Sequence, residues 1–142
     1  MARVDGELAI GDVAGRVGMS VHALRFYERE GLLLSAPRRT SAGRRVYGEA
    51  DVEWLRICTR LRDAGMPLAR LREFAGLVRE GPGNEAQRLE LLGEHEQRVR
   101  DRITELTSCL ELIAWKVGVY EQHLRAGSAE GVWAPGSGGF AS

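Results

Sequence analysis

The sequence has few cysteines and no long apolar run, and each shortage excludes a class of protein. Cys58 and Cys109 are the only cysteines, and two distant thiols cannot form the framework of a small disulfide-stabilised domain. We expect both to be free thiols. No apolar run is long enough to cross a membrane, and the first residues lack a basic and apolar signal segment. We therefore expect a cytoplasmic protein.

Catalytic and metal-binding patterns are also missing from the chain. It has no glycine-rich phosphate loop, no HExxH zinc motif and no nucleophile elbow, so we expect no enzymatic activity. His95 and His123 lie far apart along one expected helix, whereas a tetrahedral metal site needs more ligands at closer spacing. We expect no metal site and no cofactor.

The net charge is zero, but the charges are unevenly distributed. Residues 1–80 hold 14 arginines against 11 acidic residues, and residues 81–142 hold 6 basic against 9 acidic residues. The segment "PRRTSAGRRVYGE", residues 37–49, gathers Arg38, Arg39, Arg44 and Arg45. Such a run is either a solvated loop or the part of the protein that meets a polyanion.

Residues 9–31 predict two short helices joined by a turn. Gly18 fits the end of the first helix and Ser20 the N-cap of the second. Leu24 faces inward with one of Phe26 and Tyr27. The pair is either a helix-turn-helix or another small helical hairpin. The apolar face of the first helix consists of Ile10, Val13, Ala14 and Val17.

A small β-hairpin, or wing, is expected after these helices. Pro37 prevents the helix from continuing, and residues 40–43 are turn formers. "RRVY" returns as a short strand. Arginines at and beside the tip can straddle a phosphate backbone or enter a minor groove.

Two more helices follow the wing, and a break at residues 80–85, "EGPGNE", then separates a domain at 1–80 from the rest. Gly65 ends the third helix and Pro67 begins the fourth. The third helix is expected from about 49 to 64. Its inward-facing side chains are Val52, Leu55, either Cys58 or Ile57, and Leu61. The fourth carries Leu68, Leu71, Phe74 and Val78.

A long helix with an apolar seam is expected over residues 81–124. Forty helical residues span about 60 Å, too much to bury on an 80-residue domain. A second copy of the chain is the natural partner, and the alternative is a helix folded back in an intramolecular bundle. The seam alternates in steps of four and three through Val99, Ile103, Leu106, Leu110, Ile113, Val117, Tyr120 and Leu124, and Leu89 and Leu92 extend it past the polar Glu96.

The segments "IGDVAGRVGMSVHALRFYEREGLL", "RRTSAGRRVY" and "EADVEWLRICTRLRDAGMPLARLREF", followed by the seam helix, occur in this order. Together they resemble the mercury-resistance-regulator (MerR) family of bacterial transcription regulators. The resemblance implies a mostly α fold, in which a winged helix-turn-helix DNA-binding domain is followed by a long antiparallel coiled-coil dimerisation helix. It also implies a homodimer that bends and untwists promoter DNA whose recognition elements are spaced too far apart for RNA polymerase.

The resemblance further assigns roles to individual residues. The start of the second helix, residues 20–23, would enter the major groove, where His22 would read a base edge. Arg25, Tyr27 and Arg62 match positions that hold phosphates. The partners implied are promoter DNA, a second copy and, through the promoter, RNA polymerase, so the protein would work at the nucleoid. The DNA-contacting residues implied are Ser20, Val21, His22, Arg25, Tyr27, Arg38, Arg39, Arg44, Arg45 and Arg62.

A second apolar stripe on the long helix lies outside the seam and has two interpretations. It either packs on the partner's fourth helix or lines a cavity for a small organic effector. In the second case Trp133, in the glycine-rich tail at 125–142, would help to close the cavity as a lid. The alternative function is a DNA-architectural or protein-partner module that uses the same fold without an effector. The stripe consists of Cys109, Leu112, Trp115 and Val119.

Overall fold

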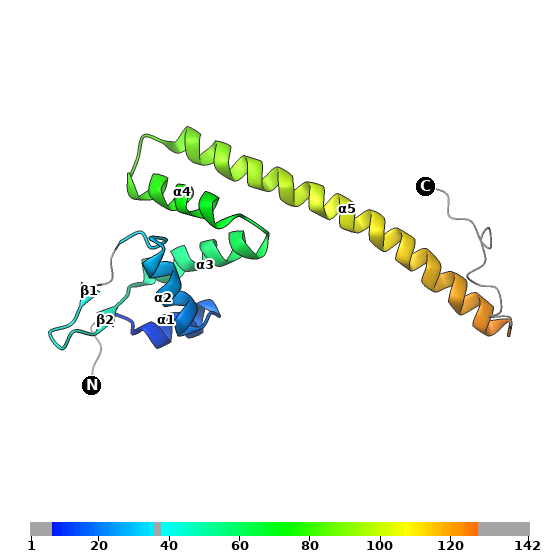
Figure 1. The fold of residues 1–142 in the computed structure, drawn as a ribbon, viewed down its shortest axis with the longest axis horizontal. Coiled ribbons are helices and arrows are strands. Elements are labelled where there is room, and N and C mark those ends of the chain that lie inside the picture. Colours follow the sequence, from blue (N-terminus) through cyan, green and yellow to red (C-terminus); the bar gives the residue numbers. More distant parts are fainter. Residues whose placement is uncertain (1–6, 36–37, 128–142) are drawn as a thin grey trace. The chain divides into compact units, whose positions relative to one another are not determined.

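The computed structural model describes residues 7–35 and 38–127, and in them it contains five helices and one two-stranded sheet (Figure 1). The chain divides into two compact units, Met1–Glu96 and Gln97–Ser142. The last helix begins in the first unit and ends in the second. The elements are α1 (Ile10–Val17), α2 (Val21–Arg29), β1 (Arg38–Arg39), β2 (Arg45–Val46), α3 (Glu49–Asp63), α4 (Leu68–Arg79) and α5 (Glu85–Arg125).

The two short helices form as the sequence predicts, because their ends carry residues that stop and start a helix. Gly18 adopts a φ of 82°, a left-handed conformation that glycine reaches without steric cost. Ser20 caps α2, since its Oγ accepts a hydrogen bond from the backbone amide of Ala23 at 3.0 Å. Leu24 is fully buried, and of its two expected neighbours Tyr27 is the buried one.

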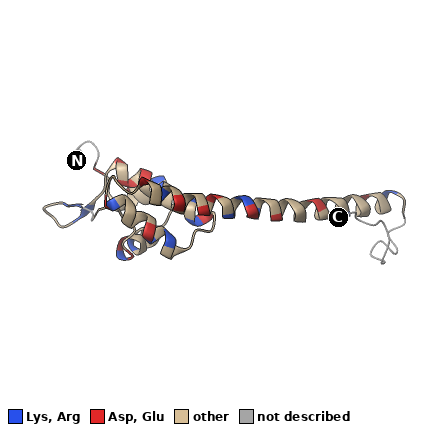
Figure 2. Cartoon of the chain, turned by 90° about the horizontal axis from the view of Figure 1, so that it is seen from above, with Lys and Arg blue, Asp and Glu red and all other residues tan. Residues whose placement is uncertain are grey.

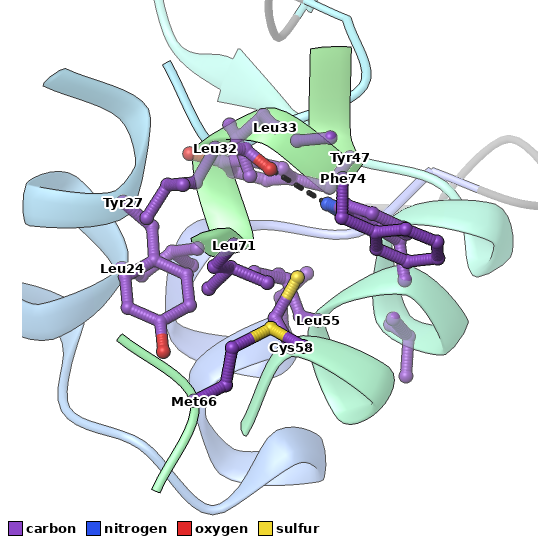
Figure 3. Close-up of a cluster of buried hydrophobic side chains, with 14 of the residues drawn as sticks. Leu24, Tyr27, Leu32, Leu33, Tyr47, Leu55, Cys58, Met66, Leu71 and Phe74 are labelled. Carbon is purple, nitrogen blue, oxygen red and sulfur yellow. Dashed lines mark hydrogen bonds between the residues drawn. The ribbon is translucent and has the colours of Figure 1, made fainter. Parts of the chain in front are cut away.

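One hydrophobic core joins α1–α4, the loop after α2 and the first turns of α5 (Figure 3). Cys58 is 0% exposed and Ile57 is 47% exposed, which decides between the two residues expected at that inward position. Trp54 is a core residue that the helical spacing did not predict. Its ring stacks on Phe74 of α4, with the ring centroids 5.6 Å apart. The fully buried side chains include Leu24, Leu32, Tyr47, Val52, Leu55, Cys58, Met66 and Leu71.

The break at residues 80–84 separates α4 from α5, as "EGPGNE" predicts. The compact first unit nevertheless continues to Glu96, because Leu91 and His95 of α5 are buried in it. Asn84 secures the turn between the helices, since its side-chain amide donates to the carbonyl of Leu77 at 2.8 Å. Pro37, expected to keep the helix from continuing, lies outside the described residues.

Helix α5 is one unbroken helix of 41 residues, and most side chains of its predicted seam are exposed. Val99 is half-buried. The exposed seam residues are Leu89, Leu92, Ile103, Leu106, Leu110, Ile113, Val117, Tyr120 and Leu124.

Candidate nucleic-acid interface

Helix α2 presents a polar face to solvent and an apolar face to the core. His22 and Arg25 are exposed, whereas Leu24 and Tyr27 are buried. The N-cap at Ser20 leaves the first amides of α2 at an exposed helix start, a site that favours anions. Arg29 is also exposed on this face. Arg29 is not among the DNA contacts predicted from the sequence, although its spacing of four residues from Arg25 places it on the same helix face.

The wing is a short antiparallel hairpin in which Arg39 pairs with Arg45 and Arg38 with Val46. Gly43 shapes its tip with a φ of 80°, and Thr40 Oγ1 accepts from the amide of Arg44 at 3.1 Å. Figure 2 shows basic residues on the hairpin. The predicted wing and its arginine-rich tip are confirmed.

The base of the wing is fastened to the first unit. The backbones of Leu8 and Tyr47 exchange two hydrogen bonds of 2.8 Å, which join the end of the wing to the segment before α1. Arg45 is half-buried and forms an ion pair with Glu28 of α2 at 3.1 Å. The position of the wing relative to α2 is therefore fixed by backbone and side-chain contacts.

A hollow of about 340 Å³, the wing hollow, lies between the start of α1, α2 and the wing. Four of the predicted DNA-contacting arginines line it, and no acidic residue does. Glu28 neutralises Arg45, but the other three guanidinium groups repel one another, so an anion lying among them is stabilised. The lining residues are Ala9, Ile10, Arg25, Arg39, Gly43, Arg44 and Arg45.

Three other predicted contacts lie outside the wing hollow. Arg38 is exposed on β1. Tyr27 is 8% exposed, so its ring belongs to the core, and burial raises the pKa of its hydroxyl. Arg62 is occupied within the chain, since its Nη1 donates to the carbonyl of Met66 at 2.8 Å and holds the turn between α3 and α4.

A second basic hollow, of about 580 Å³, lies beside the turn between α1 and α2. Arg16, Arg56 and Arg60 line it, and none of them was predicted. Arg16 forms a two-bond ion pair with Glu49 at 2.6 and 2.8 Å, which lowers the pKa of that carboxyl. The spacing of four residues between Arg56 and Arg60 places both on one face of α3, a signal present in the sequence.

The predicted effector stripe lies on the part of α5 that belongs to the second unit. Cys109 and Leu112 are exposed, and Trp115 and Val119 are half-buried. Trp133 lies outside the described residues. The Lys116 ammonium lies over the Trp115 and Tyr120 rings, at 5.5 and 5.7 Å from their centroids.

Comparison with known proteins identifies the family. A family model described as MerR HTH family regulatory protein matches residues 8–76. An HTH-type transcriptional regulator of Haemophilus influenzae is 32% identical over 122 residues, which cover 86% of this chain and 90% of the relative. This chain belongs to the MerR family.

Two further proteins, one compared by sequence and one by structure, are similar to this MerR-family chain over most of its length. The mercuric resistance operon regulatory protein of Serratia marcescens is 34% identical over 122 residues, covering 85% of this chain and 81% of that relative. A crystal structure of HiNmlR, a MerR-family regulator that lacks the sensor domain and is bound to promoter DNA, has a TM-score of 0.80 at 30% identity. The match covers 91% of this chain and 97% of that chain.

The described residues of this MerR-family chain contain no group of three or more His, Cys, Asp or Glu side chains that could hold a metal ion. Cys58 is unsuited to ligation or redox chemistry, because burial raises the pKa of its thiol to about 12. No helix within residues 7–35 and 38–127 is long and apolar enough to cross a membrane.

Proposed function

We propose that this MerR-family chain is a sequence-specific, homodimeric transcription regulator that bends and untwists double-stranded promoter DNA. The wing hollow carries the proposal, because it brings Arg25 of the second helix together with three wing arginines around a space without acidic residues. A phosphate backbone supplies the anion that such a hollow favours. The promoter-DNA-bound relative HiNmlR supports DNA as the source of that anion.

Within this proposal, α2 reads sequence and the wing provides affinity. His22, exposed on the first turn after Ser20, contacts a base edge in the major groove, while the amides of that turn and Arg25 hold phosphates. Arg44 and Arg45 contact the backbone beside the groove. Tyr27 takes part only through its hydroxyl, since its ring is in the core.

The proposed dimer forms through α5. Apolar side chains at steps of four and three lie exposed along the part of α5 that belongs to the second unit. An antiparallel partner helix would remove them from water. We assign residues 1–80 to DNA binding and 81–124 to dimerisation. A groove of about 400 Å³ on this seam, lined by Ile113, Val117 and Tyr120 among others, would receive partner side chains.

The proposed action needs no catalysis by the chain itself. Distortion of the promoter brings its two elements into the spacing that RNA polymerase requires, so the polymerase is an indirect partner and the nucleoid in the cytoplasm is the place of action. We propose that the regulator responds to a small organic effector. The effector would contact the stripe formed by Cys109, Leu112, Trp115 and Val119. Any ligand acts there only through its preference for one arrangement of the dimer.

One observation favours a second function, a DNA-architectural module that works without an effector. HiNmlR lacks the sensor domain, and this chain matches 97% of its length. The two functions separate in transcription with purified polymerase. An effector-dependent regulator changes its output when small-molecule extracts are added, and an architectural module does not.

The test of DNA binding begins by selecting bound duplexes from a random pool. We expect an inverted repeat, because a two-fold dimer reads two equal half-sites. On the selected DNA, Arg45→Ala should flatten the slope of log affinity against log salt by about 0.9, the loss of one phosphate contact. His22→Ala should instead alter which bases are preferred, with little change in slope.

Arg102→Ala is the matched control for charge, because Arg102 is an exposed arginine on α5 paired with Glu105. Its salt slope should equal that of the wild type. Recovery of no common sequence from the pool would refute sequence-specific binding. A wild-type salt slope in Arg45→Ala would refute the role of the wing.

A further inference from the structure

The loop between α2 and the wing is held by side chains of distant helices. We name residues 30–33 the carbonyl strap, because each of their four backbone carbonyls accepts a hydrogen bond from a side chain of α3 or α4. Arg79, near the end of α4, binds two of them. Its Nη1 donates to the carbonyl of Gly31 at 2.6 Å and to that of Leu33 at 2.8 Å.

The other two carbonyls of the strap are bound by Trp54 and Arg72. Trp54 Nε1 donates to the carbonyl of Leu32 at 2.7 Å, the dashed line at Leu32 in Figure 3. Arg72 Nε donates to the carbonyl of Glu30 at 3.4 Å, and its guanidinium also pairs with the Glu30 carboxylate. The strap thus joins the end of α2 to both α3 and α4.

Packing reinforces these hydrogen bonds. Leu32 is 0% and Leu33 is 6% exposed, so the strap is anchored in the core at its centre. The Trp54 ring that binds Leu32 is itself stacked on Phe74 of α4. A displacement of α4 therefore moves the donors of all four strap carbonyls, directly through its two arginines and through the stacked indole.

The opposite side of α4 is joined to the first turns of α5 within the same unit. Arg70 pairs with Glu73 on its own helix and with Glu94 on α5. Arg88 of α5 donates to the carbonyl of Gly81 at 2.6 Å, in the turn after α4. Helix α4 consequently stands between the dimerisation helix and the strap, and it contacts both through directional bonds.

We propose that Arg79 is a positioning residue that transmits the placement of α4 to α2 and the wing, and so fixes the half-site spacing that the dimer accepts. The proposal rests on the proposed function. With the strap bound, α2 and the wing follow the start of α5, and the two DNA-binding surfaces of a dimer keep one separation. Without the two hydrogen bonds of Arg79 the loop becomes more mobile. The dimer then binds operators whose half-site spacings differ by a base pair with more nearly equal affinity.

Arg79 is suited to test this idea because its side chain is exposed. In Arg79→Gln, water can solvate the released Gly31 carbonyl at its exposed contact and reach the Leu33 carbonyl at its part-buried one. We therefore expect the variant to fold. Trp54→Phe is the second variant, because it removes the indole donor to Leu32 and retains an aromatic ring for the stack on Phe74. Arg102→Gln supplies the same loss of charge outside the strap.

The experiment measures the affinity of each full-length protein for a series of duplexes in which the spacing between the selected half-sites changes by single base pairs. The wild type and Arg102→Gln should show a sharp optimum. In Arg79→Gln and Trp54→Phe the affinity ratio between the optimum and its neighbours should fall about fivefold or more, a typical coupling between sites. Loss of folded protein lowers affinity for all duplexes equally and leaves this ratio unchanged.

The outcomes separate the inference from the proposed function. If the wild type shows no spacing optimum at all, the proposed dimeric regulator is wrong. If the wild type has an optimum and both strap variants retain it with an unchanged ratio, the strap has no positioning role. If one variant unfolds, the spacing profile of the other variant decides the question. If both unfold, the strap serves only to stabilise the fold, and the inference is overturned.

Discussion

At the residue scale, the two cysteines have opposite surroundings. Cys58 on α3 is fully buried, and burial raises the pKa of its thiol to about 12. Cys109 is exposed on α5. Only the thiolate is a strong nucleophile, and the raised pKa keeps Cys58 almost entirely in the unreactive thiol form at pH 8. Buried position and protonation together make Cys58 an apolar core residue.

We predict that iodoacetamide modifies Cys58 in a Cys109→Ser variant at least about 100-fold more slowly in the native protein than in guanidinium. Because the folded pKa is raised, moving from pH 7 to pH 9 should leave the native rate slow. Mass spectrometry of quenched samples follows the reaction, and a Cys58→Ser variant isolates the exposed thiol as the control. Equal rates in native and unfolded protein would show that Cys58 is accessible.

Single residues were predictable from sequence where local spacing decides their position. The inward face of α3 followed from steps of three residues, although Cys58 and Ile57 could be separated only by the structure. Contacts across the chain left no such signal. Trp54 and Arg79 bind carbonyls that lie 22 and 46–48 residues away along the chain, and periodicity contains no information about those partners.

At the scale of elements, helix ends were predictable because capping residues determine them locally. Gly18, Ser20 and Pro67 stand where the structure ends or begins a helix. The strands of the wing are only two residues each, too short for an alternating pattern, and the turn residues indicated them instead. The inclusion of the first turns of α5 in the first unit depends on tertiary packing of Leu91 and His95.

The central prediction for α5 concerns Ile113, which is 58% exposed in the single chain and lies in the seam. Ile113→Asp would place an unpaired carboxylate from each protomer in a dry interface, at a cost of several kcal/mol. We expect a dimer at micromolar concentration for the wild type and a monomer for the variant, measured by sedimentation. Gln122→Asp, at an exposed position off the seam, should remain a dimer. A dimeric Ile113→Asp protein would refute the seam.

At the scale of the whole molecule, function depends on groups that only folding brings together. Arg25 precedes the wing arginines by more than a turn of helix and a loop, yet all line one hollow. The sequence suggested each of them separately through the family resemblance. Their common hollow could not be predicted from the sequence, because loop geometry determines how α2 meets the wing. The same holds for the second basic hollow, with Arg56 and Arg60.

The proposed regulator must distort its operator, and the most direct measurement is the end-to-end distance of that DNA. A duplex containing the selected inverted repeat is labelled with a donor and an acceptor dye at its ends, and energy transfer is followed as wild-type protein is added. We predict that energy transfer rises on binding and saturates at one dimer per duplex, because the ends approach as the DNA bends. Tight binding of the wild type with unchanged energy transfer would contradict this prediction.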